Sequence, residues 1–355
     1  MKKNLLCAIF VLMLLRLEAQ IGGTKVYEFL NLPQSARVTA LGGEVLTIAD
    51  DDAALAYTNP ALLNPQMSGS ISFSHAFHLS DLGHGNLAYA QYIKKWDVTV
   101  HGNLQYMNYG DFAGTDEFGN PTAAFSAKEY ALTLGAGRQL YEKLSVGVNV
   151  RLISSQLESY NSVGWTGDVG AVYQDTASNF SAALVFANFG SQFTAYEGDR
   201  YEGVPYNARV SISKKLRYLP VRFGLTYGYL NRWNILYDDP NQEDVSLFIG
   251  EEQSENKFGT RVDNFARHLV FNTELLLGKR ENFRIRVGYN HLRKKELSVD
   301  NFRSLAGFSL GFGLKINRFR FDFGQAFYHV AGGSTHLTLS TNLFEFTKGK
   351  QVVQD

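Results

Sequence analysis

Apolar and polar side chains alternate along many stretches of this 355-residue chain, and this pattern constrains the fold more than any other feature. In residues 144–152, LSVGVNVRL, leucine and valine alternate with Ser, Gly, Asn and Arg. Successive side chains of a β-strand point to opposite faces of a sheet, so the pattern indicates strands with one apolar and one polar face. The same alternation predicts strands in four further stretches, residues 98–106, 221–229, 283–289 and 306–316.

Several features indicate that the apolar faces meet lipid. The strands run to roughly 9–12 residues, which matches a tilted bilayer crossing and exceeds the usual length in soluble proteins. Aromatic residues gather near strand ends on the apolar face, and Gly and Arg are frequent on the polar face, as in a membrane barrel with a wet lumen. After residue 20 no apolar run reaches about 18 residues, which excludes a helical membrane protein. The alternative is a soluble β-sandwich with its apolar faces inward.

The links between the strands predict a closed barrel. From residue 69 onward tight turns alternate with longer loops, as in outer-membrane barrels with short periplasmic turns and long external loops. Closure pairs every strand edge and so satisfies the backbone hydrogen-bonding groups, for which lipid offers no partners. We therefore expect an all-β fold, a 14-stranded antiparallel transmembrane β-barrel with both ends on the periplasmic side. The expected strands cover residues 69–78, 84–93, 97–107, 127–138, 143–154, 163–174, 179–189, 206–216, 220–233, 266–278, 282–293, 303–316, 319–329 and 335–345.

The first 19 residues have the pattern of a secretory signal peptide, with two early lysines, a short apolar run and the small residue Ala19 before the expected cleavage point. Cleavage removes Cys7, the only cysteine, so we expect no disulfide and no cysteine ligand. A net charge of +0 gives no reason to expect nucleic acid as a partner. The expected organisation is a signal peptide (1–19), an N-terminal hatch (20–66), the transmembrane barrel (67–346) and a periplasmic tail (347–355).

The segment before the barrel is polar, rich in small residues and broken by turns. It carries the carboxylates of residues 50–52 and the turn former Asn59-Pro60. Because it is too polar for lipid, we expect it to enter from the periplasm and fill the wet lumen as a hatch. Its carboxylates are expected to meet cationic residues of the lumen, with the candidates Arg151, Arg222, Arg284 and Arg286. The alternative is a flexible periplasmic tail.

This segment resembles the hatch of FadL-type outer-membrane barrels. Residues 35–64, SARVTALGGEVLTIADDDAALAYTNPALLN, share their pattern of small residues around a glycine, then Ala-Asp-Asp, then Asn-Pro-Ala. The matching positions form the candidate hatch motif, which is Asp50, Asp51, Asn59, Pro60 and Ala61. The resemblance implies a fourteen-stranded barrel, in agreement with the strands counted above.

A second resemblance covers nearly the whole mature chain. It is to PorQ-type proteins, FadL-like barrels of the type IX secretion system of Bacteroidetes bacteria, which are related to PorV-type barrels. The resemblance rests on six stretches, QIGGTKVYEFLNLPQSARVTALGG (20–43), NPALLNP (59–65), YMNYGDF (106–112), LESY (157–160), RKKELS (293–298) and FYHVAGGSTH (327–336).

The second resemblance implies a role at the surface of a Gram-negative cell and no enzymatic reaction or cofactor. It implies an outer-membrane scaffold that tethers a PorZ-like surface protein. A PorU-like sortase and a PorV-like barrel would belong to the same attachment complex, which joins cargo to anionic lipopolysaccharide. The FadL-type architecture alone suggests an uptake channel for hydrophobic small molecules, although a fold is a weak guide to function.

The loop at residues 234–265 is the candidate extracellular docking surface. It holds eight acidic residues against two basic ones, together with aromatic side chains. That composition suits recognition of a partner protein. The candidate docking residues are Asp238, Asp239, Glu243, Asp244, Phe248, Glu251, Glu252 and Phe258. The alternative is a solvated loop that repels lipopolysaccharide.

Other possible sites are weaker. His75, His78 and His84 lie close in sequence, but strand alternation places His75 and His78 on opposite faces, so we expect no metal site. The glycine cluster at residues 135–137 lacks the ending of a phosphate-binding loop, and we expect it to face the lumen. No arrangement of Ser, His and Asp indicates a hydrolase, so we expect the protein not to be an enzyme.

Overall fold

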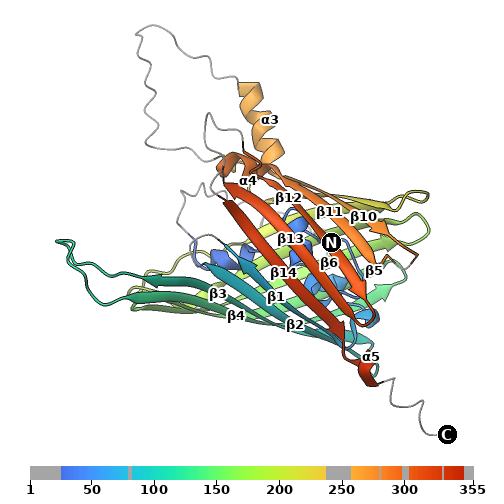
Figure 1. Cartoon of the computed structure of the whole chain (residues 1–355), viewed down its shortest axis with the longest axis horizontal. Coiled ribbons are helices and arrows are strands. Elements are labelled where there is room, and N and C mark those ends of the chain that lie inside the picture. The colour runs from blue at the N-terminus through green and yellow to red at the C-terminus, as the bar shows by residue number, and fades with distance from the viewer. Residues whose placement is uncertain are drawn as a thin grey trace, which may run out of the picture.

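A computed structural model describes residues 25–78, 82–236, 257–279, 281–297, 304–329 and 332–347. Fourteen antiparallel strands form a closed barrel in which each strand pairs with its neighbours in sequence and β1 pairs with β14 (Figure 1). The strands are β1 (Ser70–Phe77), β2 (Gly83–Ile93), β3 (Val98–Phe112), β4 (Phe125–Tyr141), β5 (Leu144–Leu157), β6 (Tyr160–Asp175), β7 (Phe180–Thr194), β8 (Asn207–Lys215), β9 (Val221–Tyr227), β10 (Leu269–Leu277), β11 (Phe283–Asn290), β12 (Phe308–Ile316), β13 (Phe319–His329) and β14 (Gly332–Asn342). The predicted all-β, fourteen-stranded barrel is confirmed.

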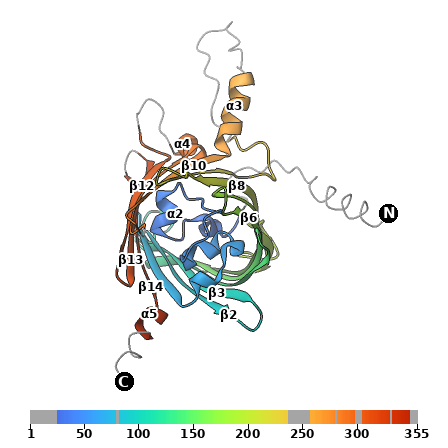
Figure 2. The same cartoon turned by 90° about the vertical axis from the view of Figure 1, so that its right-hand side faces the viewer.

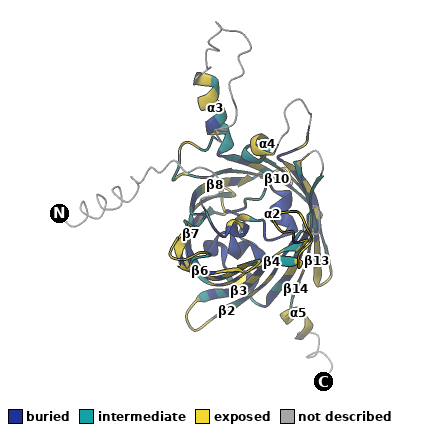
Figure 3. Cartoon of the chain, turned by 90° about the vertical axis from the view of Figure 1, so that its left-hand side faces the viewer, coloured by how far each residue is buried: buried dark blue, intermediate teal, exposed yellow. Residues whose placement is uncertain are grey.

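The two faces of the barrel wall have opposite polarity. In β5, Val148, Val150 and Leu152 are 50%, 52% and 55% exposed, whereas Asn149 and Arg151 between them are each 2% exposed. The same alternation of exposed and buried residues runs along most strands, and Figure 3 shows buried residues gathered inside the barrel. Apolar side chains therefore cover the outside of the wall, and polar side chains line the lumen.

The two rims of the barrel carry different connections. β1 begins and β14 ends at the same rim, where Ser70 pairs with Asn342. This rim also carries tight turns such as residues 94–97 and 317–318, and we call it the tight-turn rim. The opposite, loop rim is less regular than predicted, because β5 and β6 continue into a hairpin in which only Glu158 and Ser159 separate the strands. Glu158 adopts a φ of 57°, as a tight hairpin turn requires.

Several predicted strands are too long at the loop rim. β9 ends at residue 227 and not 233, and β11 ends at residue 290 and not 293. Helix α4 (His291–Glu296) starts there because the Asn290 side chain accepts a hydrogen bond from the Arg293 amide at 3.1 Å. Helix α3 (Lys257–Arg267) replaces the end of the predicted docking loop, and α5 (Phe344–Thr347) follows β14.

The hatch lies inside the barrel, as Figure 2 shows along the barrel axis. Its elements are η1 (Glu28–Asn31), α2 (Ala36–Ala40), η2 (Ala53–Tyr57), η3 (Pro60–Leu62) and η4 (Pro65–Met67). Side chains of Ser35, Asp52 and Asn59 accept backbone hydrogen bonds at the starts of α2, η2 and η3. Such polar caps allow short helical turns in a segment rich in small residues.

The described part of the hatch crosses the lumen from one rim to the other. Lys25 bridges to Gly203 in the loop between β7 and β8, and the Val26 amide donates to the Gly203 carbonyl at 2.9 Å. The described part of the hatch therefore begins at the loop rim and ends at the tight-turn rim, where β1 starts. The apolar start of the hatch packs against the lumenal side of the loop rim. Entry of the hatch from the periplasm stays a prediction.

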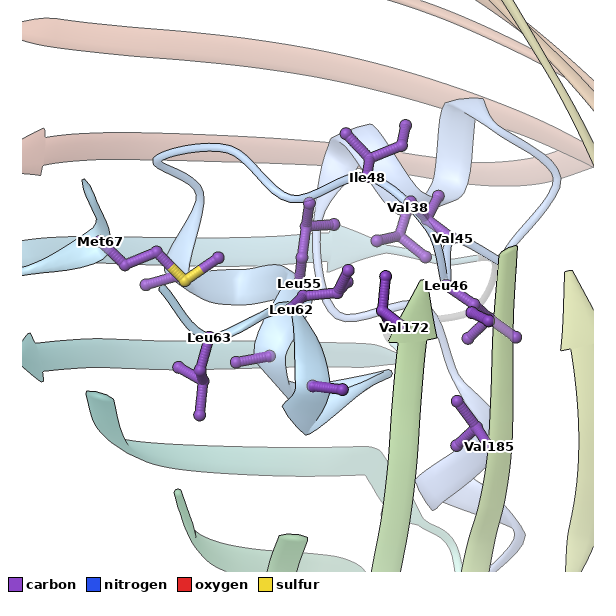
Figure 4. Close-up of a cluster of buried hydrophobic side chains, with 14 of the residues drawn as sticks. Val38, Val45, Leu46, Ile48, Leu55, Leu62, Leu63, Met67, Val172 and Val185 are labelled. Carbon is purple, nitrogen blue, oxygen red and sulfur yellow. The ribbon is translucent and has the colours of Figure 1, made fainter. Parts of the chain in front are cut away.

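The hatch has an apolar core of its own. Val38, Leu46, Leu55 and Leu62 are each fully buried, and Figure 4 shows them turned toward one another inside the barrel. Val185 of β7 joins this cluster from the wall. The hatch is thus a packed unit within the lumen. The predicted signal peptide and most of the predicted tail lie outside the described residues.

Among the described residues, no helix combines the length and the hydropathy needed to cross a membrane.

Candidate functional site

Charged side chains gather where the hatch meets strands β9–β13, and we call this surface the ionic wall. The wall residues are Arg222, Glu274, Arg284, Arg286, Lys315, Arg320 and Asp322. Facing them, the hatch contributes Arg37, Asp50, Asp51 and Asp52. Cationic groups outnumber carboxylates on the wall, so the carboxylates of the hatch supply negative charge that the wall lacks.

Arg37, in α2, lies at the centre of this site. Its side chain is 1% exposed, and its Nη1 lies 2.8 Å from Asp50 Oδ2 and 3.3 Å from Asp52 Oδ2. Its Nη2 lies 3.3 Å from Oε1 of Glu274 on β10. A buried guanidinium requires such partners because an uncompensated charge is expensive to keep out of water. Arg37 therefore joins two segments of the hatch to each other and to the wall.

Further charged contacts with the hatch come from β11, β12 and β13, and Arg209 of β8 lies 2.7 Å from Glu44 of the hatch. Arg284 Nη1 lies 3.3 Å from Asp50 Oδ2. Arg320 Nη2 lies 2.5 Å from Asp51 Oδ1, and Lys315 Nζ lies 3.4 Å from Asp51 Oδ2. Consecutive carboxylates thus reach different strands, which fixes the orientation of the hatch segment around the barrel axis.

The three carboxylates of the hatch are not equivalent. Burial alone would raise the pKa of Asp50, but Arg37 and the neighbouring wall arginines hold that pKa far below its ordinary value. Burial also opposes ionisation of Asp51, and Arg320 overcomes it, so the pKa of Asp51 is lowered. For Asp52 burial prevails over Arg37, and the Asp50 charge adds to it, so the pKa of Asp52 is raised.

A second lumenal surface holds the other side of the hatch, and we call it the glycine wall. It consists of Gly137 on β4, Gly147 on β5 and Gly170 on β6. A Cβ on Gly137 or Gly147 would overlap the backbone at Pro60, and a Cβ on Gly170 would overlap the side chain of Asn59. The lumen-facing glycines therefore permit the close approach of η3.

The Asn-Pro-Ala part of the hatch motif shapes the hatch itself. The Asn59 side chain donates to the Leu46 carbonyl at 2.7 Å and accepts from the Ala61 amide at 3.0 Å. Pro60 occupies the start of η3, a position that its fixed φ favours. All three residues of this motif are buried, so they position the hatch and are not exposed for binding.

Arg151 does not pair with the hatch carboxylates, and that prediction was wrong. Its guanidinium forms a bidentate contact with Asp168 of β6, at 2.6 Å and 2.5 Å. It also donates to the Tyr57 carbonyl at 2.9 Å, and its Cζ lies 4.1 Å from the centroid of the Tyr57 ring. The physical reason is that Asp168 faces the lumen on the adjacent strand and neutralises Arg151 within the wall.

Two further predicted partners contact wall carboxylates and not the hatch. Arg222 Nη1 lies 2.8 Å from Glu274 Oε2. Arg286 lies 2.9 Å from Glu274 and 2.5 Å from Asp322. Of the four candidate arginines, Arg284 alone forms an ion pair with Asp50, Asp51 or Asp52 within the described part of the chain. Glu274 connects the other two arginines to the hatch through Arg37.

Most of the predicted docking surface lies outside the described residues. Asp238, Asp239, Glu243, Asp244, Phe248, Glu251 and Glu252 all fall there. Phe258 lies in α3 and is 76% exposed. Its role in docking a partner stays a prediction.

The histidines near the first loop contact one another and the hatch. His78 Nε2 lies 2.7 Å from His84 Nδ1, and His84 Nε2 lies 2.8 Å from the Pro33 carbonyl. His75 contacts the Tyr106 hydroxyl at 2.7 Å on the outer face of the barrel. Over the described ranges, no group of three or more His, Cys, Asp or Glu residues is arranged to hold a metal ion.

The loop rim is filled by the start of the hatch. Val26, Phe29 and Leu30 pack against Met107 and Ile153 of the wall. Nearby lies a cavity of about 220 Å³, lined by Leu157, Tyr160, Tyr196, Glu197, Arg200 and Glu202. The hatch thus occupies the lumen from the loop rim to the tight-turn rim.

Sequence reasoning missed Arg37, Glu274, Arg320 and Asp322. A signal for the three wall residues was present, because each falls on the polar, lumen-facing side of an alternating strand. Asp322, for example, lies between Phe321 and Phe323. No signal distinguished Arg37, which stands in a short run of small residues without strand alternation.

Comparison with known proteins places this architecture among solved outer-membrane barrels. No family model and no curated protein sequence matches the chain. The fold is similar to the TodX monoaromatic hydrocarbon channel deltaS2 mutant, with a TM-score of 0.51 and 11% identity over 87% of this chain and 97% of that chain. It is similar to the CymD monoaromatic hydrocarbon channel, with a TM-score of 0.50 and 14% identity over 87% of this chain and 97% of that one.

A Pseudomonas aeruginosa FadL homologue has a TM-score of 0.49 and 9% identity over 87% of this chain and 98% of its own length. Identities this low demonstrate similarity of fold and nothing about ligand. The chain therefore has the architecture of FadL-like barrels, a closed fourteen-stranded barrel with an N-terminal hatch.

Proposed function

We propose that the chain is a non-enzymatic outer-membrane channel that takes up a small hydrophobic molecule past its hatch. The observation that carries this proposal is the similarity of fold over 87% of the chain to two channels named for monoaromatic hydrocarbons. The ligand class belongs to those proteins by name and comes to this chain as part of the proposal.

An outer-membrane location is a part of the same proposal. On β4, Leu132 and Leu134 are 47% and 63% exposed in the middle of a strand, where water would disfavour them. Closure pairs each strand with two neighbours through the body of the barrel, which is the condition for a β-structure in lipid. These observations support an environment of lipid around the barrel and water within it.

Passage through such a barrel requires the hatch to move relative to a wall. At the glycine wall the hatch makes van der Waals contacts, and beside it wall side chains donate hydrogen bonds to hatch carbonyls, as Arg151 does to the Tyr57 carbonyl. At the ionic wall, movement of the hatch would separate buried charges such as those of Arg37 and Glu274. The contrast supports a path that opens beside the glycine wall while the ionic wall keeps the hatch inside the barrel.

A second candidate function is a scaffold of the type IX secretion system. The buried ion pairs around Arg37 favour it, because they hold the hatch in place as a static support would need. In this proposal the barrel tethers a PorZ-like surface protein beside a PorU-like sortase and a PorV-like barrel. It rests on sequence resemblance, whereas the fold comparisons favour the channel.

Deletion of the gene separates the two candidates. We expect cells without the barrel to take up a radiolabelled monoaromatic hydrocarbon more slowly, with uptake restored by the wild-type gene. Secreted proteins should remain attached to the surface of these cells. Unchanged uptake together with release of surface proteins would reject the channel and favour the scaffold. If neither property changes, both candidates are wrong.

A further inference from the structure

Helix α3 turns its apolar face away from the protein, whereas a surface helix in water turns that face toward the core. Phe258, Val262 and Phe265 recur at the spacing of one helical face, and they are 76%, 50% and 46% exposed. Asn264, away from this face, is 3% exposed, and His268, directly after the helix, is 1% exposed. The helix therefore directs its polar side toward the barrel and its apolar side outward, as the barrel wall itself does.

The polar side of α3 is firmly attached. The Asn264 side chain donates to the Trp233 carbonyl at 2.6 Å and accepts from the Ile235 amide at 3.1 Å. Asp263 lies 3.0 Å from Lys295 Nζ and 3.3 Å from His291 Nε2, both in α4. These contacts fix which side of α3 faces outward, so the exposed apolar stripe is a built feature of the rim.

The apolar stripe of α3 continues the apolar outer surface of the barrel. The Phe265 ring lies 5.7 Å from the ring of Tyr227, which ends β9 on the same outward face as the exposed Phe223. Trp233 is 58% exposed close by. In Figures 1 and 2, α3 extends away from the barrel wall and not over the lumen. Aromatic residues at a rim of this kind are typical of the boundary between lipid and water.

We infer that α3 is an amphipathic helix that lies in the outer lipid leaflet, with its apolar stripe among acyl chains and Arg261 at anionic headgroups. Arg261 is exposed and precedes Val262 on the outward side of the helix. Helices with an apolar stripe and basic residues bind lipid surfaces with the apolar face about 5–10 Å below the headgroup boundary. This inference rests on the outer-membrane location in the proposed function.

The test uses the full mature chain, which contains no cysteine once the predicted signal peptide is removed. Three variants, V262C, T260C and L132C, each receive a nitroxide label in vesicles of phosphatidylcholine with or without phosphatidylglycerol. Spin-label accessibility to oxygen and to a water-soluble nickel complex gives the depth of each label. We expect the labels on V262C and L132C to lie in lipid, and the label on T260C to lie in water.

The controls distinguish the possible failures. A label on V262C in water, with L132C in lipid, would overturn the role of α3 and leave the membrane barrel intact. A label on L132C in water would reject the membrane location itself. If V262C is protected only in intact cells and not in vesicles, a protein covers α3 and the lipid inference is wrong. With phosphatidylglycerol present, the V262C label should move deeper, and the added substitution R261E should abolish that shift.

Discussion

The ionic wall and the glycine wall hold the same hatch by different means. At the ionic wall, hatch and strands exchange charges, as Arg37 does with Glu274 at 3.3 Å. Beside the glycine wall, β5 and β6 neutralise their own charges through Arg151 and Asp168, and Arg151 donates a hydrogen bond to the hatch. The glycines themselves let the hatch backbone approach closely. One wall therefore requires the hatch for its charge balance, and the other only accommodates its shape.

This difference predicts where the hatch is released. Separation from the ionic wall leaves buried charges unpaired, at a cost of about 3–5 kcal/mol for each broken pair. Separation from the glycine wall leaves the Arg151–Asp168 pair intact and exposes groups that water can hydrate. We therefore expect the hatch to open beside the glycine wall first.

The largest effect is expected for Arg37→Met. Methionine keeps much of the side-chain volume but leaves Asp50, Asp52 and Glu274 without their shared guanidinium. The free energy that holds the hatch should fall by about 3–5 kcal/mol. Native-state hydrogen exchange of residues 36–63 in the detergent-solubilised barrel measures this loss. Arg138→Met is the matched control, because its 3.6 Å contact with Asp97 joins two exposed side chains, and unchanged exchange in both variants would argue against a role for Arg37.

A smaller effect separates two adjacent carboxylates. Asp50→Asn should cost about 1.5–3 kcal/mol because a charge-assisted contact with Arg37 becomes neutral. Asp52→Asn should change stability little, because burial already opposes ionisation of Asp52 and an amide oxygen can still cap the Ala54 amide. Equal losses in the two variants, measured by the same exchange experiment, would contradict the assigned roles.

The pH dependence follows from the directions of these pKa shifts. The pKa values of Asp50 and Asp51 are lowered, so the two carboxylates contribute to the stability of the folded hatch above the unfolded pKa of about 3.9. This stabilisation is lost as pH falls through the lower folded pKa values. The pKa of Asp52 is raised, so its pH dependence runs the other way. Its protonated form stabilises the folded hatch at low pH, and this stabilisation is lost as pH rises through the raised pKa. Hatch protection factors should therefore be no lower at pH 5 than at pH 7, and they should fall in stronger acid. Asp52→Asn should remove any gain in hatch protection at pH 5. Protection factors that decline steadily from pH 7 downward would contradict this assignment.

On the glycine wall, Gly147→Ala should weaken the hatch by about 1–3 kcal/mol, as overpacking does elsewhere. The added methyl group would overlap the Pro60 backbone, so η3 must move. Gly102→Ala is the control, because its Cβ would lie 3.8 Å from the nearest atom, Leu134 Cδ2. Limited proteolysis of the hatch compares the two variants. Equal cleavage would show that η3 does not rest on Gly147.

The smallest effect is expected at the loop rim. Tyr27→Phe removes one hydrogen bond, between the tyrosine hydroxyl and Ser162 Oγ at 2.6 Å, and leaves the ring in place. A loss of about 0.5–1.5 kcal/mol is expected, confined to residues 25–32 in hydrogen exchange. A loss that spreads to the ionic wall would show that the two ends of the hatch are coupled, contrary to the comparison drawn here.

Strand alternation was sufficient to predict the barrel, because the outside of the wall and the lumen require opposite polarity of neighbouring residues. It placed Asn149 and Arg151 in the lumen and Val150 outside. It failed at the loop rim, where β9 and β11 end early. β11 ends because the capping of α4 by Asn290 prevails over strand propensity. Alternation does not encode where a strand ends.

The partners of the hatch were harder to predict than its location. Alternation shows that Arg151, Arg284 and Arg286 face the lumen, but it does not show which carboxylate each one meets. That depends on register across neighbouring strands, which places Asp168 diagonal to Arg151 and Glu274 directly opposite Arg286. The direction in which the hatch crosses the lumen depends on tertiary packing at residues 25–30, for which the sequence carries no periodic signal.

Zero-length cross-linking tests most directly whether hatch carboxylates lie on the ionic wall. A carbodiimide joins an amine to a carboxylate only in direct contact, and Lys315 Nζ lies 3.4 Å from Asp51 Oδ2 with both side chains about one-third exposed. Mass spectrometry of the barrel in its native fold should detect the Lys315–Asp51 link, together with the Lys143–Asp175 link, whose contact of 3.0 Å lies within the barrel wall. Detection of the Lys143–Asp175 link without any link from Lys315 to Asp51 would contradict a hatch held against the ionic wall.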